Sequence, residues 1–335
     1  LAVRPRAAQL ARERAGSRAL SRNNPAPQSY AWGLGYLLLG FTALAWGLNF
    51  PILKLGLENS PPLLFTSMRM ALGAITMFII AACMGILRLP HRADWPVLFS
   101  VGILQNMAFI SLVTLGLQFL PAGRAAILAY TTPIWVVPAA ALFLGERFTL
   151  PRAVGVGLGL SGLLTVFNPL SISWDNREVF IGSGLIMLAT LIWTVGLVHV
   201  RKHHWHGDVL ALIPWQVLIS VVVLTPIALF FEDPSEIIWE PTFSWQLLFS
   251  GAVASGLCVA AQVAAMRSLP AVSLSLSSAS VPAVGLLAAS WFLHEQPTSS
   301  DLSGFALIAT GILIVGLADR RQALRTRREA ESSIT

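Results

Sequence analysis

Polar side chains inside long apolar runs are the groups of this chain that could bind a solute. Arg69 lies about 10 Å inside its run, counted at 1.5 Å per residue, and could present positive charge to a carboxylate. Trp46 and Trp193 also lie inside their runs, where they could form aromatic walls for a flat or cationic substrate. Uncharged hydrogen-bonding groups in further runs complete the candidate site: Gln105, Asn106, Tyr130, Gln216 and Gln262. The structural alternative for each is packing or hydrogen bonding between helices.

Lys54 lies near the end of the preceding run and could share such a carboxylate with Arg69. Alternatively its side chain extends to the membrane surface, or pairs with Glu58. No Asp or Glu occupies the middle of a run, so the sequence offers no buried carboxylate relay for coupling to protons.

The sequence predicts neither an enzyme nor a cofactor. It contains no phosphate-cradling loop or adenine-nucleotide motif, and no Ser-His-Asp arrangement can be assembled from it. His203, His204 and His206 form a cluster, but Asp208 is their one carboxylate neighbour at ligand spacing, so we expect no metal site.

The composition places these groups in a membrane protein. Apolar residues make up 55% of 335 residues and charged residues 11%, with a mean hydropathy of +0.71. Soluble domains carry roughly 25% charged residues. Runs of about 20 apolar residues cross a bilayer. We expect ten: Leu34–Leu57, Leu63–Met84, Val97–Leu117, Arg124–Leu144, Ala153–Phe167, Ile181–Val200, Val209–Phe231, Trp245–Met266, Ala271–Leu293 and Leu302–Leu317.

Basic residues set the expected orientation. With both termini in the cytoplasm, 18 of the 22 Lys and Arg residues fall on the cytoplasmic side, as the positive-inside rule requires. The net charge of +6 therefore indicates topology and no nucleic-acid partner. We expect a disordered basic cytoplasmic tail at 1–30 and a basic cytoplasmic tail at 318–335.

The stretch from Leu120 to Val166 occurs twice. Leu120-Pro121-Ala122, Thr132-Pro133 and Leu144-Gly145-Glu146 reappear 149 residues later as Leu269-Pro270-Ala271, Val281-Pro282 and Leu293-His294-Glu295. This match indicates an internal duplication with five-helix repeats at 34–167 and 181–317. Because five is odd, the second copy would cross the membrane in the opposite direction, as an inverted repeat. Arg69 and Gln216 correspond at a nearby offset of 147.

Three prolines and two glutamates have predicted mechanical roles. Pro51, Pro133 and Pro282 are candidate hinges or gates, because a proline inside a helix removes a backbone hydrogen bond and kinks it. For the matched pair Pro133 and Pro282, broken-helix elements at symmetric depth are part of the same interpretation. Static bends are the alternative.

Glu146 and Glu295 lie at helix ends, where we expect them to cap the following helix rather than transfer protons. For Glu146 the alternative structural role is an ion pair with Arg147 or Arg152.

Two motifs resemble a known family. Trp46-Gly47-Leu48-Asn49-Phe50 with Lys54 resembles the first-helix signature of the drug/metabolite transporter superfamily, EamA-like branch. The block from Pro121 to Leu128, Pro133 and Leu142-Phe143-Leu144-Gly145-Glu146-Arg147 resembles its fourth and fifth helices. The resemblance covers roughly residues 34–318. It implies ten transmembrane helices in two halves, and it adds Asn49 to the candidate substrate site. In the second half Gly196 stands at the position of Asn49, and no proline matches Pro51.

The sequence therefore predicts an all-α integral membrane protein of the bacterial inner membrane. As a secondary transporter it would export amino acids or related small metabolites by alternating access. Its partners would be the lipid bilayer and a small-molecule substrate, and a monomer is compatible with the sequence. A carrier of organophosphates or nucleotide sugars is the first alternative, and it would need several basic residues in the cavity. A membrane-embedded sensor or enzyme is the second.

Overall fold

The computed structural model describes residues 29–146, 148–167, 177–269 and 271–332. These residues form helices and no strand. The expected tail at 1–30 lies almost wholly outside them. The elements are α2 (Ser29–Gly56), α3 (Pro62–Cys83), η1 (Arg92–Asp94), α4 (Trp95–Ser100), η2 (Val101–Ala108), α5 (Phe109–Leu117), α6 (Ala122–Ala129), α7 (Thr132–Leu144), α8 (Leu150–Phe167), α9 (Arg177–Lys202), α10 (Val209–Phe231), η3 (Pro234–Glu236), α11 (Pro241–Leu248), η4 (Phe249–Leu257), α12 (Cys258–Ser268), α13 (Ala271–Phe292) and α14 (Ser299–Ser332).

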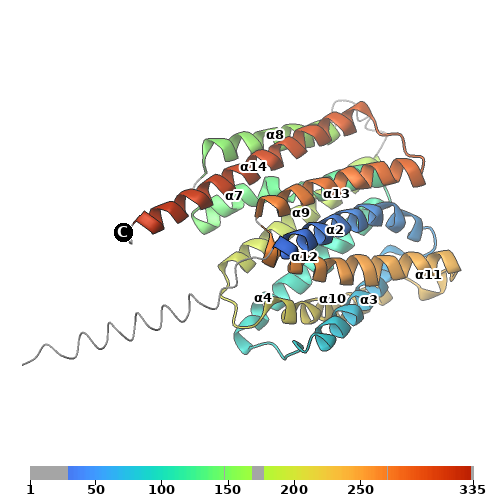
Figure 1. Ribbon diagram of the computed structural model, residues 1–335. Helices are drawn as coiled ribbons and strands as arrows, with labels where there is room; N and C mark the ends of the chain where they lie inside the picture. The colour runs from blue at the N-terminus through green and yellow to red at the C-terminus, as the bar shows by residue number, and fades with distance from the viewer. Residues whose placement is uncertain (1–28, 147, 168–176, 270, 333–335) are drawn as a thin grey trace, which may run out of the picture.

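Nine helical segments of the described chain are long and apolar enough to cross a bilayer. They match nine of the ten expected spans. The remaining one, the ninth in chain order, corresponds to α13, in which Ser277–Phe292 is a shorter apolar segment. The helices form one bundle in which α8 and α14 lie side by side at one edge (Figure 1).

Glycines allow α8 and α14 to approach closely. A Cβ atom on Gly162 would lie 2.6 Å from the Gly304 carbonyl oxygen, and one on Gly304 would lie 2.8 Å from the Gly162 oxygen. Gly155 and Gly311 face each other in the same reciprocal way, with 2.7 Å between a Gly155 Cβ and the Gly311 oxygen. The glycine rows are therefore a packing surface between two membrane helices.

Two spans contain π-helical segments at corresponding places. η2 lies in the third span, between α4 and α5, and η4 lies between α11 and α12. They begin 148 residues apart and end 149 residues apart, close to the offset of the sequence duplication. A π segment shifts the backbone bonding by one residue and is common at functional sites.

The fourth span is two helices, not the single helix expected over Arg124–Leu144. The helix breaks at Tyr130–Thr131, and Pro133 lies in the first turn of α7, where its missing N–H leaves no helical bond unmade. The Thr132 hydroxyl donates to the Ala129 carbonyl at 3.3 Å, which is the carbonyl that residue 133 of a continuous helix would bind. Pro133 therefore begins a helix and does not kink one.

In the second half, the proline that corresponds to Pro133 lies in a different structural setting. Pro282 lies inside the continuous helix α13, and Pro51 lies inside α2. Val281 stands where Thr132 stands in the first half and has no hydroxyl to donate. The predicted pair of equivalent prolines thus occupies one broken and one unbroken helix.

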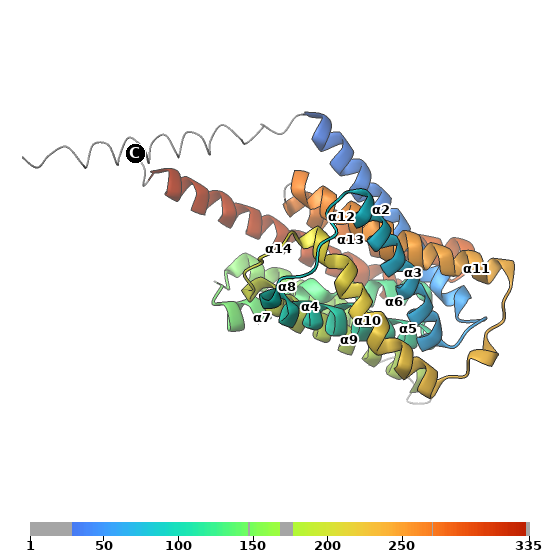
Figure 2. The same ribbon diagram turned by 90° about the horizontal axis from the view of Figure 1, so that it is seen from below.

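The end of the chain continues as a helix. α14 extends to Ser332, so most of the predicted basic tail at 318–335 is helical. Figures 1 and 2 show this helix projecting beyond its neighbour α8.

Candidate functional site

Arg69 is a buried cation near the middle of the bundle. It is 6% exposed, and its Nη2 donates to Ser255 Oγ at 3.2 Å. Its Nε has no hydrogen-bond partner, and no carboxylate of the described chain lies within salt-bridge distance of it. An unpaired buried charge is unfavourable by several kcal/mol, roughly, so this guanidinium is suited to an anion from outside the protein.

The π segment η4 brings α2 and α3 together at this place. Trp46 Nε1 donates to the Ala254 carbonyl at 2.9 Å, and Arg69 bonds the next residue, Ser255. The Ala254 carbonyl lies within η4 and has two lone pairs, so it can accept this side-chain bond. Asn49 lies one turn beyond Trp46 on α2, and its Oδ1 is buried without a partner in the described chain. Trp46 and Arg69 therefore bind neighbouring residues of η4, from α2 and α3 respectively.

Gln105 and Trp193 meet in a second group. Gln105 Nε2 donates to the Trp193 carbonyl at 3.4 Å, across the contact between η2 and α9. Gly196 makes room for it, since a Cβ there would lie 2.9 Å from Gln105 Cγ. The Trp193 ring packs on Phe109 with centroids 4.7 Å apart. This group is a contact between helices, with the amide held against backbone.

Tyr130 ends α6 at the break in the fourth span. Its ring meets Phe50 edge-on, with centroids 6.4 Å apart. The break therefore positions the Tyr130 ring against α2.

The other predicted amides do not join one another. Gln216 is buried on α10, and its side chain makes no hydrogen bond within the described residues, nor does that of Asn106 in η2. Gln262 Oε1 is buried without a partner in the same part of the chain. Ser255 was not predicted as a site residue, because a serine in an apolar run gives no signal of which side chain it will meet.

Two cationic side chains near the helix ends, Lys54 and Arg124, bind polar groups of the protein itself. Lys54 Nζ donates to the carbonyls of Leu117, Gln118 and Leu120 at 2.7, 3.1 and 3.0 Å, so it caps the end of α5. Arg124 pairs with Asp301 at 2.8 Å. We expected Lys54 to extend to the membrane surface or to pair with Glu58. Its hydrogen bonds are instead to these three carbonyls.

Glu295 and Glu146 join the two halves of the chain at corresponding positions. Glu295 accepts from the backbone N–H groups of Ala122 at 2.6 Å and Gly123 at 3.0 Å, so it caps α6 and not the helix that follows it. Glu146 binds Arg201 at 3.1 Å and Arg152 at 3.1 Å. Arg201 is the repeat counterpart of Lys54, so each half supplies a glutamate held by groups of the other half.

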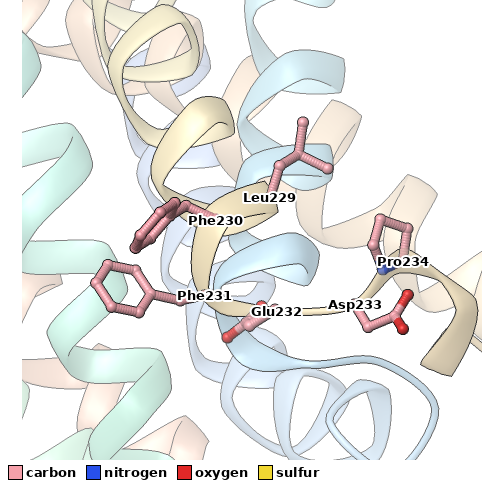
Figure 3. A pocket seen from close by; sticks show the side chains of 6 residues that line it. All are labelled: Leu229, Phe230, Phe231, Glu232, Asp233 and Pro234. Atoms are coloured by element: carbon pink, nitrogen blue, oxygen red, sulfur yellow. The ribbon is translucent and has the colours of Figure 1, made fainter.

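A surface depression lies at the end of α10, far along the chain from these groups. Figure 3 shows that Leu229 to Pro234 line it, with Phe230 and Phe231 on the exposed side. Glu232 in this segment accepts from the N–H groups of Leu63 and Leu64 and so caps α3. The N–H of Ser235 donates to Asp233 at 2.8 Å, which lowers the pKa of that carboxyl. These interactions indicate a helix connection, not a substrate site.

The fold and composition define a multi-pass membrane protein whose helical bundle contains buried polar groups. The model of the EamA-like transporter family matches residues 33–168 and again residues 180–317. The chain belongs to this family, and it is a membrane transporter.

Named relatives agree with this class. The transporter YoaV of Bacillus subtilis is 27% identical over 271 residues, which cover 81% of this chain and 92% of the relative. A probable amino-acid metabolite efflux pump of Escherichia coli is 25% identical, covering 81% and 91%. A probable terminal-alkyne amino-acid exporter of Streptantibioticus cattleyicolor is 25% identical, covering 88% and 96%. A crystal structure with 20% identity has a TM-score of 0.60 over 86% of this chain and 97% of that one, so the fold is shared.

Proposed function

We propose that this protein is an inner-membrane secondary transporter that exports amino acids or related small metabolites. The observation that carries the substrate class is the unpaired guanidinium of Arg69. A substrate carboxylate would supply the missing anion, and Arg favours planar oxyanions through its fork of N–H donors. The amino-acid names of two relatives support the same class.

Alternating access between two inverted repeats is the proposed mechanism. The family model matches twice, and the glycine contacts support a two-fold relation. In the sequence duplication Gly155 corresponds to Gly304, and Gly162 corresponds to Gly311. The contact between Gly155 and Gly311 is therefore equivalent to the contact between Gly304 and Gly162. This is the pattern that a two-fold axis between the repeats would produce. With α13 counted as a crossing, each half has five spans, and the basic residues favour both termini in the cytoplasm.

A phosphate-bearing substrate is less well supported. An organophosphate or nucleotide sugar carries at least two negative charges at neutral pH and calls for several free cations. Lys54 is committed to three carbonyls and Arg124 to Asp301. Arg69 is thus matched to a single carboxylate.

Counterflow in proteoliposomes tests the proposal. Vesicles loaded with a pool of amino acids are compared with vesicles loaded with a sugar phosphate, using the wild type, Arg69→Gln and Arg69→Lys. Arg92→Gln is the matched control, because Arg92 is exposed outside the bundle interior. We expect amino-acid exchange in the wild type and in the control. Arg69→Gln should lose it by about 30-fold, which corresponds to roughly 2 kcal/mol of a buried charge contact.

A second comparison isolates the carboxylate. For each amino acid that exchanges, the matching amine without a carboxylate is offered as a competitor. The wild type should prefer the amino acid, and Arg69→Gln should lose this preference. Unchanged amino-acid flux in Arg69→Gln would remove Arg69 from the site, and flux of the sugar phosphate alone would favour the organophosphate alternative.

A further inference from the structure

Three side chains that carry metal-binding atoms lie close together, and they come from two different connections between helices of the bundle. Asp94 ends η1, ahead of the third span, and His203 and His206 lie between α9 and α10. One ligand atom from each lies within 4.8 Å of the others. The sequence prediction of no metal site considered only neighbours along the chain, and Asp94 lies 109 residues from His203.

The present distances are close to those of a coordinated ion. Asp94 Oδ1 lies 2.8 Å from His203 Nε2 and 3.2 Å from His206 Nδ1. Ligand atoms about 2.05 Å from a tetrahedral Zn²⁺ lie roughly 3.3 Å apart. The two distances to Asp94 Oδ1 therefore need to change by at most about half an ångström to match a coordinated ion, and the two imidazole nitrogens lie within 4.8 Å of each other.

A simple ion pair leaves part of this cluster unexplained. Asp94 Oδ1 receives both imidazoles and the His206 backbone N–H, while Oδ2 is buried and has no partner in the described chain. A buried acceptor without a partner is unfavourable by about 1–3 kcal/mol. Gly207 lies next to this oxygen, and a Cβ there would make an ordinary van der Waals contact with Oδ2 at 3.6 Å.

The surroundings orient the imidazoles and leave one side open. The Asp94 side chain is 0% exposed and that of His203 is 15%, whereas that of His206 is 48% exposed, so an ion could enter past His206. The His206 ring stacks on His91 with centroids 5.1 Å apart, and the His203 ring meets Trp205 edge-on. Fixed ring orientations of this kind support metal ligands.

We propose that Asp94, His203 and His206 bind one divalent transition-metal ion of the Zn²⁺ class, with water completing the coordination. Two imidazoles and one carboxylate suit Zn²⁺ and its neighbours, whereas Mg²⁺ and Ca²⁺ prefer oxygen ligands. Such an ion would tie the connection before the third span to the connection after α9. The two connections belong to the segments matched separately by the family model.

Equilibrium dialysis of the purified full-length protein against Zn²⁺ tests this site, with a purification tag that contains no histidine. We expect one ion per chain in the wild type, no competition from Mg²⁺, and an increase in Tm on Zn²⁺ binding. Asp94→Asn and His206→Gln should each weaken binding by roughly 100-fold or more. His204→Gln is the control, because His204 is exposed in the same connection and outside the cluster.

The variants also separate metal loss from misfolding. His206 is half exposed, so His206→Gln should fold with the Tm of the metal-free wild type and lose the Tm increase. Less than half an equivalent of Zn²⁺ in the wild type would overturn the proposal. Equal loss of Zn²⁺ in His204→Gln and His206→Gln would do the same.

Discussion

Replacing Glu295 by glutamine should open one face of the transporter. The carboxylate of Glu295 accepts from two N–H groups of α6, at 2.6 and 3.0 Å, and so joins the second half to the first. Hydrogen bonds to a charged group contribute about 1.5–3 kcal/mol each, whereas a glutamine keeps one neutral acceptor oxygen worth about 1 kcal/mol. The loss is therefore at least about 2 kcal/mol, which shifts the equilibrium toward the open face by roughly 30-fold or more.

Glu146→Gln gives the matched comparison at the opposite face. Glu146 is 33% exposed and Arg201 is 42% exposed, so this ion pair contributes only about 0–1 kcal/mol. The shift should be no more than roughly fivefold and should open the other face. Glu178→Gln is the control, since Glu178 is exposed in the first turn of α9.

Spin-label distances measure the two faces separately. One pair of labels stands at Gln118 and Gln296, near Glu295, and the other at Phe148 and Lys202, near Glu146; all four side chains are exposed. Both native cysteines are first replaced, by Cys83→Ser and Cys258→Ala, so that the spin labels attach only at the chosen positions. Glu295→Gln should lengthen the first distance only. The reasoning is refuted if both variants open the same face, or if Glu295→Gln changes neither distance.

Two further substitutions test the structural roles of Lys54 and the glycine rows. Lys54→Met should lower the free energy of unfolding by about 2–3 kcal/mol, because three carbonyls lose a charged donor. Reversible unfolding in SDS measures it against the exposed Lys202→Met; unchanged stability with lost substrate binding would contradict the capping role. Gly162→Ala should destabilise by about 1–3 kcal/mol in the same assay, since its Cβ would lie 2.6 Å from a backbone oxygen of α14. Gly157→Ala, with nothing within 4 Å of its Cβ, should be neutral or slightly stabilising, and equal losses in both would contradict the packing argument.

The positions of the membrane spans and the family could be predicted, because each is recognised from residues that are close together in the sequence. Twenty apolar residues between short polar connections indicate a crossing regardless of what the helix packs against. The motif around Trp46 and Asn49 likewise lies within a few residues. A broken helix near Pro133 was among the interpretations of its proline, but the position of the break at Tyr130–Thr131 was not predicted, because the proline was considered without the neighbouring threonines. Thr132 supplies the donor that Pro133 lacks, so the helix can end there without an unpaired carbonyl.

The ion pair of Glu146 with Arg152 was predicted, because the two residues lie close in the sequence. The contacts of Lys54, Glu295 and Asp94 could not be predicted, because each joins segments far apart in the chain. Lys54 finds the carbonyls at the end of α5, and Glu295 finds the N–H groups that begin α6. Helix ends present these groups in every membrane helix, so composition gives no preference for one end over another. Asp94 and His203 are separated in the same way, and nothing near either residue indicates the other.

The differences between the halves locate the candidate substrate site better than their similarities do. Residues that correspond after exchange of the halves, such as Gly155 with Gly304, make reciprocal contacts and serve packing. Arg69 has only Gln216 as its counterpart, and Asn49 has only Gly196, where the missing side chain admits Gln105. Arg69 has no carboxylate of the described chain within salt-bridge distance, and under the proposed function a substrate carboxylate would supply that anion.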